Sequence, residues 1–227
     1  NIKICKGVPS GIAMITISDS GENAITVASG ANEKLLPDDL DEAEEAFHEA
    51  DYMIIQLETP LETVEKAVCL CGEFKTTVIL NPAPAAVLSD EILAGVSIIT
   101  PNETEAERLT GIKVDGFQSA QKAAGVLHHR GVGIVIITMG SAGAFVSDRD
   151  TGLVKMIAGF NVKAEDTTAA GDVFNGQLAV ALSEGLSLEE AIRMAHAAAA
   201  LSVQQLGAQS SIPRREETDY FLEQNQN

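Results

Sequence analysis

Short apolar runs alternate with longer amphipathic stretches along most of the chain. The runs that predict strands are 51–57, 77–80, 96–100 and 133–138. In the stretches between them, apolar residues recur every three or four positions, which is the spacing of one face of a helix. The helices predicted in this way are 61–74, 103–109 and 119–129. Apolar strands separated by amphipathic helices favour a parallel sheet that is covered on both faces.

Hairpins and further helices flank this core. Residues 11–18 and 24–28 read as strands around the turn-forming loop Asp19-Ser-Gly-Glu-Asn23, which predicts an antiparallel hairpin. A second hairpin is predicted from 144–147 and 153–157. Helical spacing also occurs at 40–50, 171–183 and 188–206. We therefore expect one α/β domain over 1–227 with a small β element at its front.

The charge of the chain limits its partners. Its 227 residues include 33 acidic and 15 basic ones, which gives a formal net charge of −18. This balance argues against nucleic acids and anionic membranes, because both would repel it. A nucleotide is still allowed, since ATP brings Mg²⁺ and is held by local dipoles. No apolar run reaches the roughly 20 residues that span a bilayer, and the first residues are not a signal peptide.

The cysteines indicate a reducing compartment. Cys5, Cys69 and Cys71 fit neither a disulfide framework nor a zinc spacing. Cys69 and Cys71 are two residues apart in a predicted helix, so their side chains project in different directions. We expect unpaired thiols and a cytoplasmic protein. The chain begins at Asn1 without an initiator Met, so we expect that its true start was cut or lost.

One segment has the composition of an anion site. No Gly-Lys pair of a Walker A motif occurs, and no Gly-x-Gly-x-x-Gly follows a strand. Asp166-Thr-Thr-Ala-Ala-Gly-Asp172, however, precedes a long apolar helix, and its small residues leave successive backbone N–H groups open to an anion. Asp172 lies in the first turn, where a carboxylate could accept a proton from a hydroxyl. Open backbone N–H groups next to a carboxylate that can act as a base suit phosphoryl transfer. The segment alone, however, favours the alternative that Asp166 and Thr167 form an ordinary helix cap.

Together with Phe174-Asn-Gly176, this segment closely resembles the C-terminal signature of ribokinase and related sugar kinases. Further segments resemble ribokinases in the same order: Gln56-Leu-Glu-Thr-Pro60, Asn81-Pro-Ala-Pro-Ala85, Pro101-Asn-Glu-Thr-Glu-Ala-Glu107 with Leu109-Thr-Gly111, Thr138-Met-Gly-Ser-Ala-Gly143 and His196-Ala-Ala-Ala-Ala200. The resemblance runs over essentially the whole chain. It implies a ribokinase-like three-layer α/β fold, with a mainly parallel sheet between helices and a partial β lid from about residues 1–30.

The resemblance also implies residues for the sugar and the phosphate. Asp172 corresponds to the general base that binds and deprotonates the sugar hydroxyl. The amides of Ala169, Ala170 and Gly171 correspond to the anion hole for the γ-phosphoryl group. Glu58 corresponds to a carboxylate that hydrogen-bonds the sugar; without the resemblance it reads as a solvated residue at a strand end.

Nucleotide and metal residues are implied in the same way. Those for ATP are Asn102, Thr138, Met139, Gly140, Ser141, Ala142, Gly143, Gly171 and His196. Glu105 corresponds to a residue that acts on Mg²⁺ through water. The simpler alternatives are a helix N-terminus at 102–105, a strand-to-strand turn at 138–143 and a packed helix residue at 196. Ribokinases are activated by K⁺, and the matching positions are Asp166, Thr168, Ser202, Gln205, Gly207 and Ser211.

The activity implied is ATP-dependent phosphorylation of D-ribose at O5. Two alternatives stay open: a kinase for another sugar such as deoxyribose, and a chain that binds nucleotide without turnover. The second stays open because ribokinases grip the sugar with an upstream Asn-x-Asp element and a Gly-Gly-Lys-Gly-x-Asn loop, and neither pattern occurs here. The resemblance thus implies a chain without the N-terminal segment, and a homodimer through the β lid where the full chain is present.

Overall fold

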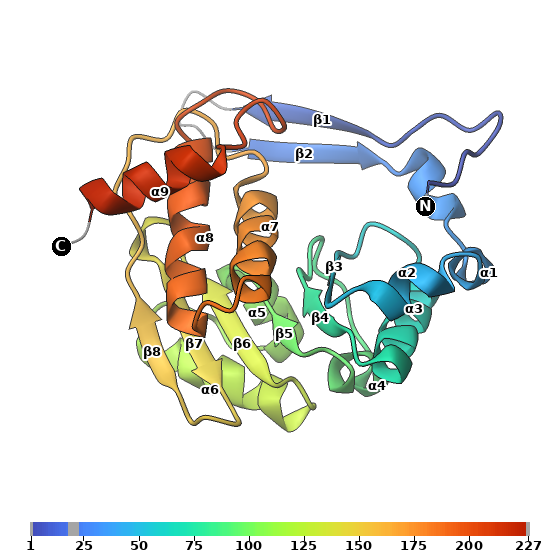
Figure 1. Ribbon diagram of the computed structural model, residues 1–227, viewed down its shortest axis with the longest axis horizontal. Coiled ribbons are helices and arrows are strands. Elements are labelled where there is room, and N and C mark those ends of the chain that lie inside the picture. The colour runs from blue at the N-terminus through green and yellow to red at the C-terminus, as the bar shows by residue number, and fades with distance from the viewer. Residues whose placement is uncertain (1, 18–22, 226–227) are drawn as a thin grey trace.

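The computed structural model describes residues 2–17 and 23–225 and is built on a six-stranded sheet (Figure 1). The strands, in their order across the sheet, are β3 (Tyr52–Ile55), β4 (Thr77–Leu80), β5 (Ile98–Ile99), β6 (Ile134–Thr138), β7 (Ala144–Asp148) and β8 (Val154–Ile157). Neighbouring strands from β3 to β6 pair in parallel, with Ile55 opposite Leu80 and Ile98 opposite Ile134. β7 is antiparallel to both β6 and β8, so the predicted second hairpin extends the sheet.

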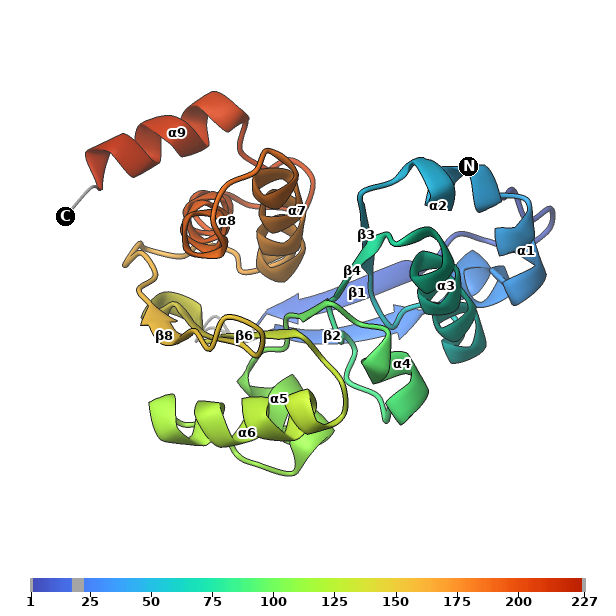
Figure 2. The same ribbon diagram turned by 60° about the horizontal axis from the view of Figure 1, so that its bottom comes forward.

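Helices cover both faces of this sheet (Figure 2). One face carries α3 (Leu61–Phe74), α4 (Asp90–Ala94), α5 (Glu103–Thr110) and α6 (Phe117–His129). The other carries α7 (Ala170–Ser183) and α8 (Leu188–Ser202), and α9 (Arg215–Gln224) packs against α8. The predicted three-layer α/β architecture with a mainly parallel sheet is therefore confirmed. Within the described residues, no helix is both long and apolar enough to cross a membrane.

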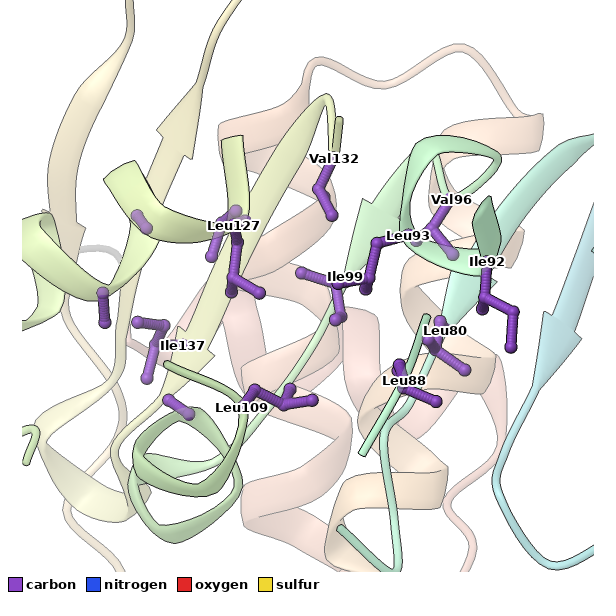
Figure 3. Close-up of a cluster of buried hydrophobic side chains, with 14 of the residues drawn as sticks. Leu80, Leu88, Ile92, Leu93, Val96, Ile99, Leu109, Leu127, Val132 and Ile137 are labelled. Carbon is purple, nitrogen blue, oxygen red and sulfur yellow. The ribbon is translucent and has the colours of Figure 1, made fainter. Parts of the chain in front are cut away.

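The central strands β4, β5 and β6 are largely apolar because both of their faces are buried. Leu80, Ile99 and Ile137 face α3 to α6 in the larger buried cluster (Figure 3). Ile79, Ile98 and Ile136, one residue earlier in each strand, belong to the cluster under α7 and α8. Successive side chains of a strand point to opposite faces, so each central strand contributes to both cores.

The predicted front hairpin forms a separate two-stranded sheet. β1 (Ile12–Ile17) and β2 (Asn23–Ala28) pair antiparallel, with Ile12 opposite Ala28. The loop expected between them falls largely on 18–22, outside the described residues. The hairpin leaves Ile12, Met14 and Val27 more than half exposed. A 3₁₀ helix (Gly30–Lys34) leads from it toward the main sheet.

Four local predictions were wrong or incomplete. The single helix expected over 40–50 is two short ones, α1 (Pro37–Asp41) and α2 (Glu44–Glu49), because Ala43 leaves helical geometry with φ −110° and ψ 8°. β3 was expected to be buried, but it is the edge strand, and Ile54 is 43% exposed. The helix expected over 188–206 ends at Ser202, and its residues 203–206 are turns. α4 and α9 were not predicted at all.

Candidate active site

The start of α7 is anchored to the sheet from inside the core. The buried Thr100, which follows β5, donates from Oγ1 to Oδ1 of Asn175 at 2.7 Å. Nδ2 of Asn175 in turn donates to the carbonyl oxygen of Gly171 at 2.8 Å. Buried polar groups with complete partners fix geometry, since leaving either one unpaired is costly. The first turn of α7 is thereby held at the carboxyl end of the parallel strands.

The backbone just before α7 turns so that amide groups converge. Ala169 adopts left-handed geometry with φ 60° and ψ 11°, and Ala170 after it begins the helix. A left-handed residue next to a right-handed one forms a concave set of N–H groups that suits an anion. The amide of Ala170 has only a 3.3 Å contact with the Thr167 carbonyl. The predicted anion-hole residues Ala169, Ala170 and Gly171 thus lie together at a helix N-terminus, where the dipole is positive.

Asp172 lies in the first turn of α7 and meets the end of β3. Nε2 of Gln56, the residue after β3, donates a hydrogen bond to Oδ1 of Asp172. The side chain of Asp172 keeps contact with solvent, but the surrounding protein raises the pKa of its carboxyl, and the Gln56 bond opposes that rise. Glu58 is exposed two residues farther along the same segment. The structure therefore brings the segment carrying Glu58 to the first turn of α7.

A cavity of about 290 Å³ opens beside this helix start. Its lining residues are Thr138, Gly140, Ser141, Phe160, Val162, Ala164, Thr167, Ala170, Gly171, Phe174, His196, Ala199, Ala200 and Val203. Five of the residues predicted for ATP are among them: Thr138, Gly140, Ser141, Gly171 and His196. Ala170 and Gly171 place backbone amides at one part of the wall, whereas phenylalanine, valine and alanine side chains supply most of the rest.

The other predicted nucleotide residues lie off this wall. Met139 is partly buried against the core under α5 and α6. Gly143 has φ +99°, and a Cβ there would lie 2.0 Å from the carbonyl oxygen of Ile157. Glycine at this position is thus required by the β6–β7 connection itself. Ala142 is exposed in the 3₁₀ helix (Gly140–Ala142) of that connection.

His196 presents a buried nitrogen without a protein partner. It is 7% exposed, and its Nε2 has no hydrogen-bond partner among the described residues. Burial lowers the pKa of the imidazole to about 4, so the ring is neutral at neutral pH. Its ring packs edge to face on Phe174, with the ring centroids 5.1 Å apart. A ligand in the cavity could satisfy this nitrogen, which an ordinary core histidine would bond within the protein.

Asn102 and Glu105 form a capping box at the start of α5. Glu105 N–H donates to Oδ1 of Asn102 at 2.9 Å, and Asn102 N–H donates to Oε2 of Glu105 at 2.8 Å. Burial raises the pKa of the Glu105 carboxyl, against the effect of these bonds. Asn102 also pairs with Thr138 in a parallel bridge, which places the capping box beside the cavity wall. The helix-cap interpretation of these residues is therefore correct, and it leaves their role toward phosphate and Mg²⁺ open.

The segments expected to hold K⁺ are joined by several hydrogen bonds. Asp166 accepts from Thr168 N–H at 2.9 Å and from Gly207 N–H at 3.0 Å. Hydrogen bonds lower the pKa of Asp166, with the largest effect from Thr168 and the next from Gly207, so this carboxylate stays ionised at neutral pH. Glu165 N–H also donates to the Val203 carbonyl at 2.7 Å.

The remaining residues of that set differ in their surroundings. Hydroxyls of Ser202 and Ser211 donate to the carbonyls of Ala199 and Ala208, both at 2.9 Å, and Gln205 is exposed. Across the part of the chain that the structure describes, no three His, Cys, Asp or Glu side chains converge as a metal site. An ion here would depend on carbonyl oxygens and Asp166.

Several site residues could not be found from the sequence pattern. Gln56 belongs to a segment that resembles ribokinases, but its contact with Asp172 spans 116 residues of sequence. Phe160, Val162 and Ala164 lie in an irregular connection between β8 and α7, where no periodicity marks an inward face. Ala199, Ala200 and Val203 read as helix packing residues.

Comparisons with known proteins agree with this arrangement. The model of the pfkB family carbohydrate kinases matches residues 1–215. A ribokinase of Haemophilus influenzae is 51% identical over 214 residues, covering 94% of this chain and 69% of that protein. A deoxyribokinase of Salmonella typhi is 37% identical over 218 residues, covering 96% of this chain and 71% of that protein.

A solved structure shares the fold closely. The ribokinase of Arabidopsis thaliana, whose structure was solved in complex with ribose and ATP, superposes with a TM-score of 0.88 at 32% identity. That match covers 95% of this chain and 71% of the Arabidopsis chain. The three-layer arrangement described above is thus the ribokinase-like fold. The family match and the 51% identity show that the chain belongs to the pfkB family of carbohydrate kinases.

Proposed function

We propose that this chain carries the phosphoryl-transfer site of a kinase that phosphorylates D-ribose at O5 with ATP. One observation carries the proposal. The Asp172 carboxylate, held by Gln56, lies in the same helix turn as the amides of Ala170 and Gly171, which line the cavity. A base and an anion site one residue apart are what transfer of a phosphoryl group to a hydroxyl requires.

In the proposed reaction, the Asp172 carboxylate takes the proton of the ribose O5 hydroxyl. O5 forms a bond to the γ-phosphorus while the bond from that phosphorus to the bridging oxygen of ADP breaks. The products are ribose 5-phosphate, ADP and a protonated Asp172, which returns the proton to solvent. The amides of Ala169, Ala170 and Gly171 would stabilise the negative charge on the moving group. Glu58, on the segment beside Asp172, would hydrogen-bond the sugar.

Two cations would assist at residues of this chain. Mg²⁺, when bound with ATP, would neutralise part of the negative charge on the phosphates. Glu105, a single carboxylate next to the cavity wall, suits a contact to that ion through water better than direct coordination. K⁺ would be held by Asp166 and by oxygens of Thr168, Ser202, Gln205, Gly207 and Ser211. The bonds that join 165–168 to Val203 and Gly207 support this placement.

Deoxyribose is the second candidate sugar because of the 37% identity to a deoxyribokinase. The two are separated by ADP formation in a coupled assay with ribose, 2-deoxyribose or no sugar. We expect the highest kcat/KM with ribose. Preference for deoxyribose would reverse the sugar assignment, and binding of ATP without turnover of either sugar would reduce the proposal to a nucleotide-binding chain.

Replacing Gln56 is expected to change the pH dependence of turnover. The Gln56 hydrogen bond lowers the pKa of Asp172, so Gln56→Leu raises that pKa and moves the acid limb of kcat to higher pH. We expect kcat on the acid limb to fall about tenfold, the effect of a lost hydrogen bond to a charged group, and kcat near neutrality to change less. Gln56→Glu, of equal size, places a second carboxylate beside Asp172 and should move the limb farther. Unchanged pH profiles in both variants would show that the amide does not act on the base.

We also propose that two copies associate through the β1–β2 hairpin. An isolated two-stranded hairpin is marginally stable in water, and this one exposes Ile12, Met14 and Val27. Burying those side chains against a second hairpin would remove the exposed surface. A cytoplasmic location is proposed because Cys5, Cys69 and Cys71 are all free.

A further inference from the structure

Phe160 forms part of the cavity wall but is not among the residues implied by the resemblance. It lies in the irregular connection between β8 and α7, and it lines the same cavity as His196, Ala199 and Ala200. These residues make a largely apolar surface, and the amides of Ala170 and Gly171 lie elsewhere on the wall. A nucleoside triphosphate has the same two parts, since its base is flat and weakly polar and its phosphates are anionic. Phe160 thus belongs to the part of the wall that suits the base.

Two side chains from outside the cavity hold the Phe160 ring. Phe221 of α9 packs on it edge to face, with the ring centroids 5.0 Å apart and an interplanar angle of 74°. The guanidinium carbon of Arg193 lies 5.9 Å from the Phe160 centroid, within the range of a cation–π contact. Arg193 also donates from Nη2 to the carbonyl oxygen of Asn225 at 2.6 Å. The same arginine therefore contacts both Phe160 and the end of α9.

α9 is itself firmly attached to the domain. Arg215 donates to both carboxylate oxygens of Glu184, at 2.7 and 2.8 Å, and to Asp219 one turn later. Thr218 is fully buried, and Leu222 packs into the cluster under α7 and α8. Figure 2 shows α9 outside α8, in the outermost position of that layer. Because α9 is held at several points, its Phe221 side chain can fix the position of the Phe160 ring that packs on it.

We propose that α9 positions Phe160 as a wall of the base-binding part of the cavity, directly through Phe221 and with the help of Arg193 of α8, which contacts both Phe160 and the end of α9. These two are positioning residues, because neither lines the cavity itself. Without Phe221, the ring loses the contact that sets its orientation, and the space for the base becomes less defined. This inference rests on the proposed function in one respect, namely that a nucleotide occupies the cavity.

The test measures binding by calorimetry, without sugar, for ATP and for inorganic tripolyphosphate as a probe of the anion part alone. We expect Phe221→Ala to weaken ATP binding about fivefold, the contribution of one aromatic pair, and to leave tripolyphosphate binding unchanged. Tyr220→Ala is the matched control, because Tyr220 is the adjacent residue of the same helix and is 65% exposed. Arg193→Met should act like Phe221→Ala, and Arg193→Lys should restore part of the affinity by keeping the cation.

Each outcome decides for or against the inference. Wild-type ATP affinity in Phe221→Ala overturns it, and an equal loss of ATP and tripolyphosphate binding overturns it too, since that pattern indicates general damage. Phe221→Leu, checked by thermal unfolding, replaces the alanine variant if the latter does not fold. The double variant Phe160→Ala/Phe221→Ala should bind ATP no worse than Phe160→Ala alone; additive losses contradict positioning through Phe160. If the wild-type chain binds neither ATP nor ADP, it is the proposed nucleotide site that fails.

Discussion

Asp172→Asn is expected to lower kcat for ribose phosphorylation by about 10²–10⁴-fold, the usual contribution of a positioned general base. The amide has nearly the shape of the carboxylate but cannot accept the O5 proton at neutral pH. The Gln56 side chain still has a carbonyl oxygen to bond, so its contact with α7 survives as a neutral amide pair. Because Asp172 is not needed to hold the nucleotide in this proposal, the KM for ATP should change little.

The matched control is Asp150→Asn, which removes the same charge at an exposed turn between β7 and β8 that does not line the cavity. It should keep wild-type kcat, and both variants should keep the wild-type unfolding temperature and ADP affinity. Turnover by Asp172→Asn near the wild-type rate would show that another group accepts the proton. Loss of ADP binding by that variant would instead show that Asp172 holds the nucleotide site together.

The sequence pattern predicts the fold best where local and global demands agree. The helix over 61–74 and the strand over 77–80 have the predicted bounds, because α3 buries one continuous stripe and β4 is covered on both faces. When every inward position of a helix or strand is buried, its apolar residues follow the expected spacing without a gap. The parallel sheet follows from those strands and their intervening helices.

The two helices that were missed give a weak helical pattern, because α4 has only five residues and α9 is mostly polar. α9 buries only Thr218 fully and attaches by Arg215, Phe221 and Leu222, so its sequence shows no continuous apolar stripe. β3 was predicted as a strand, but nothing in its apolar pattern distinguishes an edge strand from a central one. The break between α1 and α2 at Ala43 depends on its backbone angles, and an alanine in the sequence does not indicate a helix end.

The residues of the candidate site also fall into those that a local segment indicates and those that only the folded chain brings together. Asp172 and the small residues before it lie in one short segment, so their place at a helix N-terminus could be predicted without the fold, whereas the segment alone favoured an ordinary helix cap and the roles in phosphoryl transfer were implied by resemblance. Gln56 and Phe160 depend on partners that are distant in sequence, and glutamine or phenylalanine has no composition that marks such a contact. His196 lies between these cases: its position was implied by resemblance, but only the structure shows a buried nitrogen without a partner.

Gly171→Ala is expected to separate stability from activity. A Cβ at Gly171 meets nothing within 4 Å, so the protein itself has room for the methyl group. Alanine is also a better helix former than glycine by about 1 kcal/mol, so the free energy of unfolding should stay equal or rise. The methyl group would, however, stand at the helix N-terminus where the γ-phosphoryl group is proposed to lie. We expect kcat/KM for ATP to fall at least about 10²-fold, because the methyl group would displace the phosphoryl group from a donor of the anion hole.

Gly125→Ala in α6 is the matched control, because Gly125 is an exposed helix glycine whose added Cβ likewise meets nothing within 4 Å. It should raise the unfolding temperature to a similar extent and leave turnover unchanged. Since the methyl group at Gly171 is expected to displace the γ-phosphoryl group, ATP binding should weaken more than ADP binding in that variant. Equal affinities for ATP and ADP together with wild-type turnover would place the transferred phosphoryl group away from the amides of α7. A loss of turnover confined to Gly171→Ala would place it there, because both substitutions add a methyl group at an exposed helix position and, of the two, Gly171 is the one that lines the cavity.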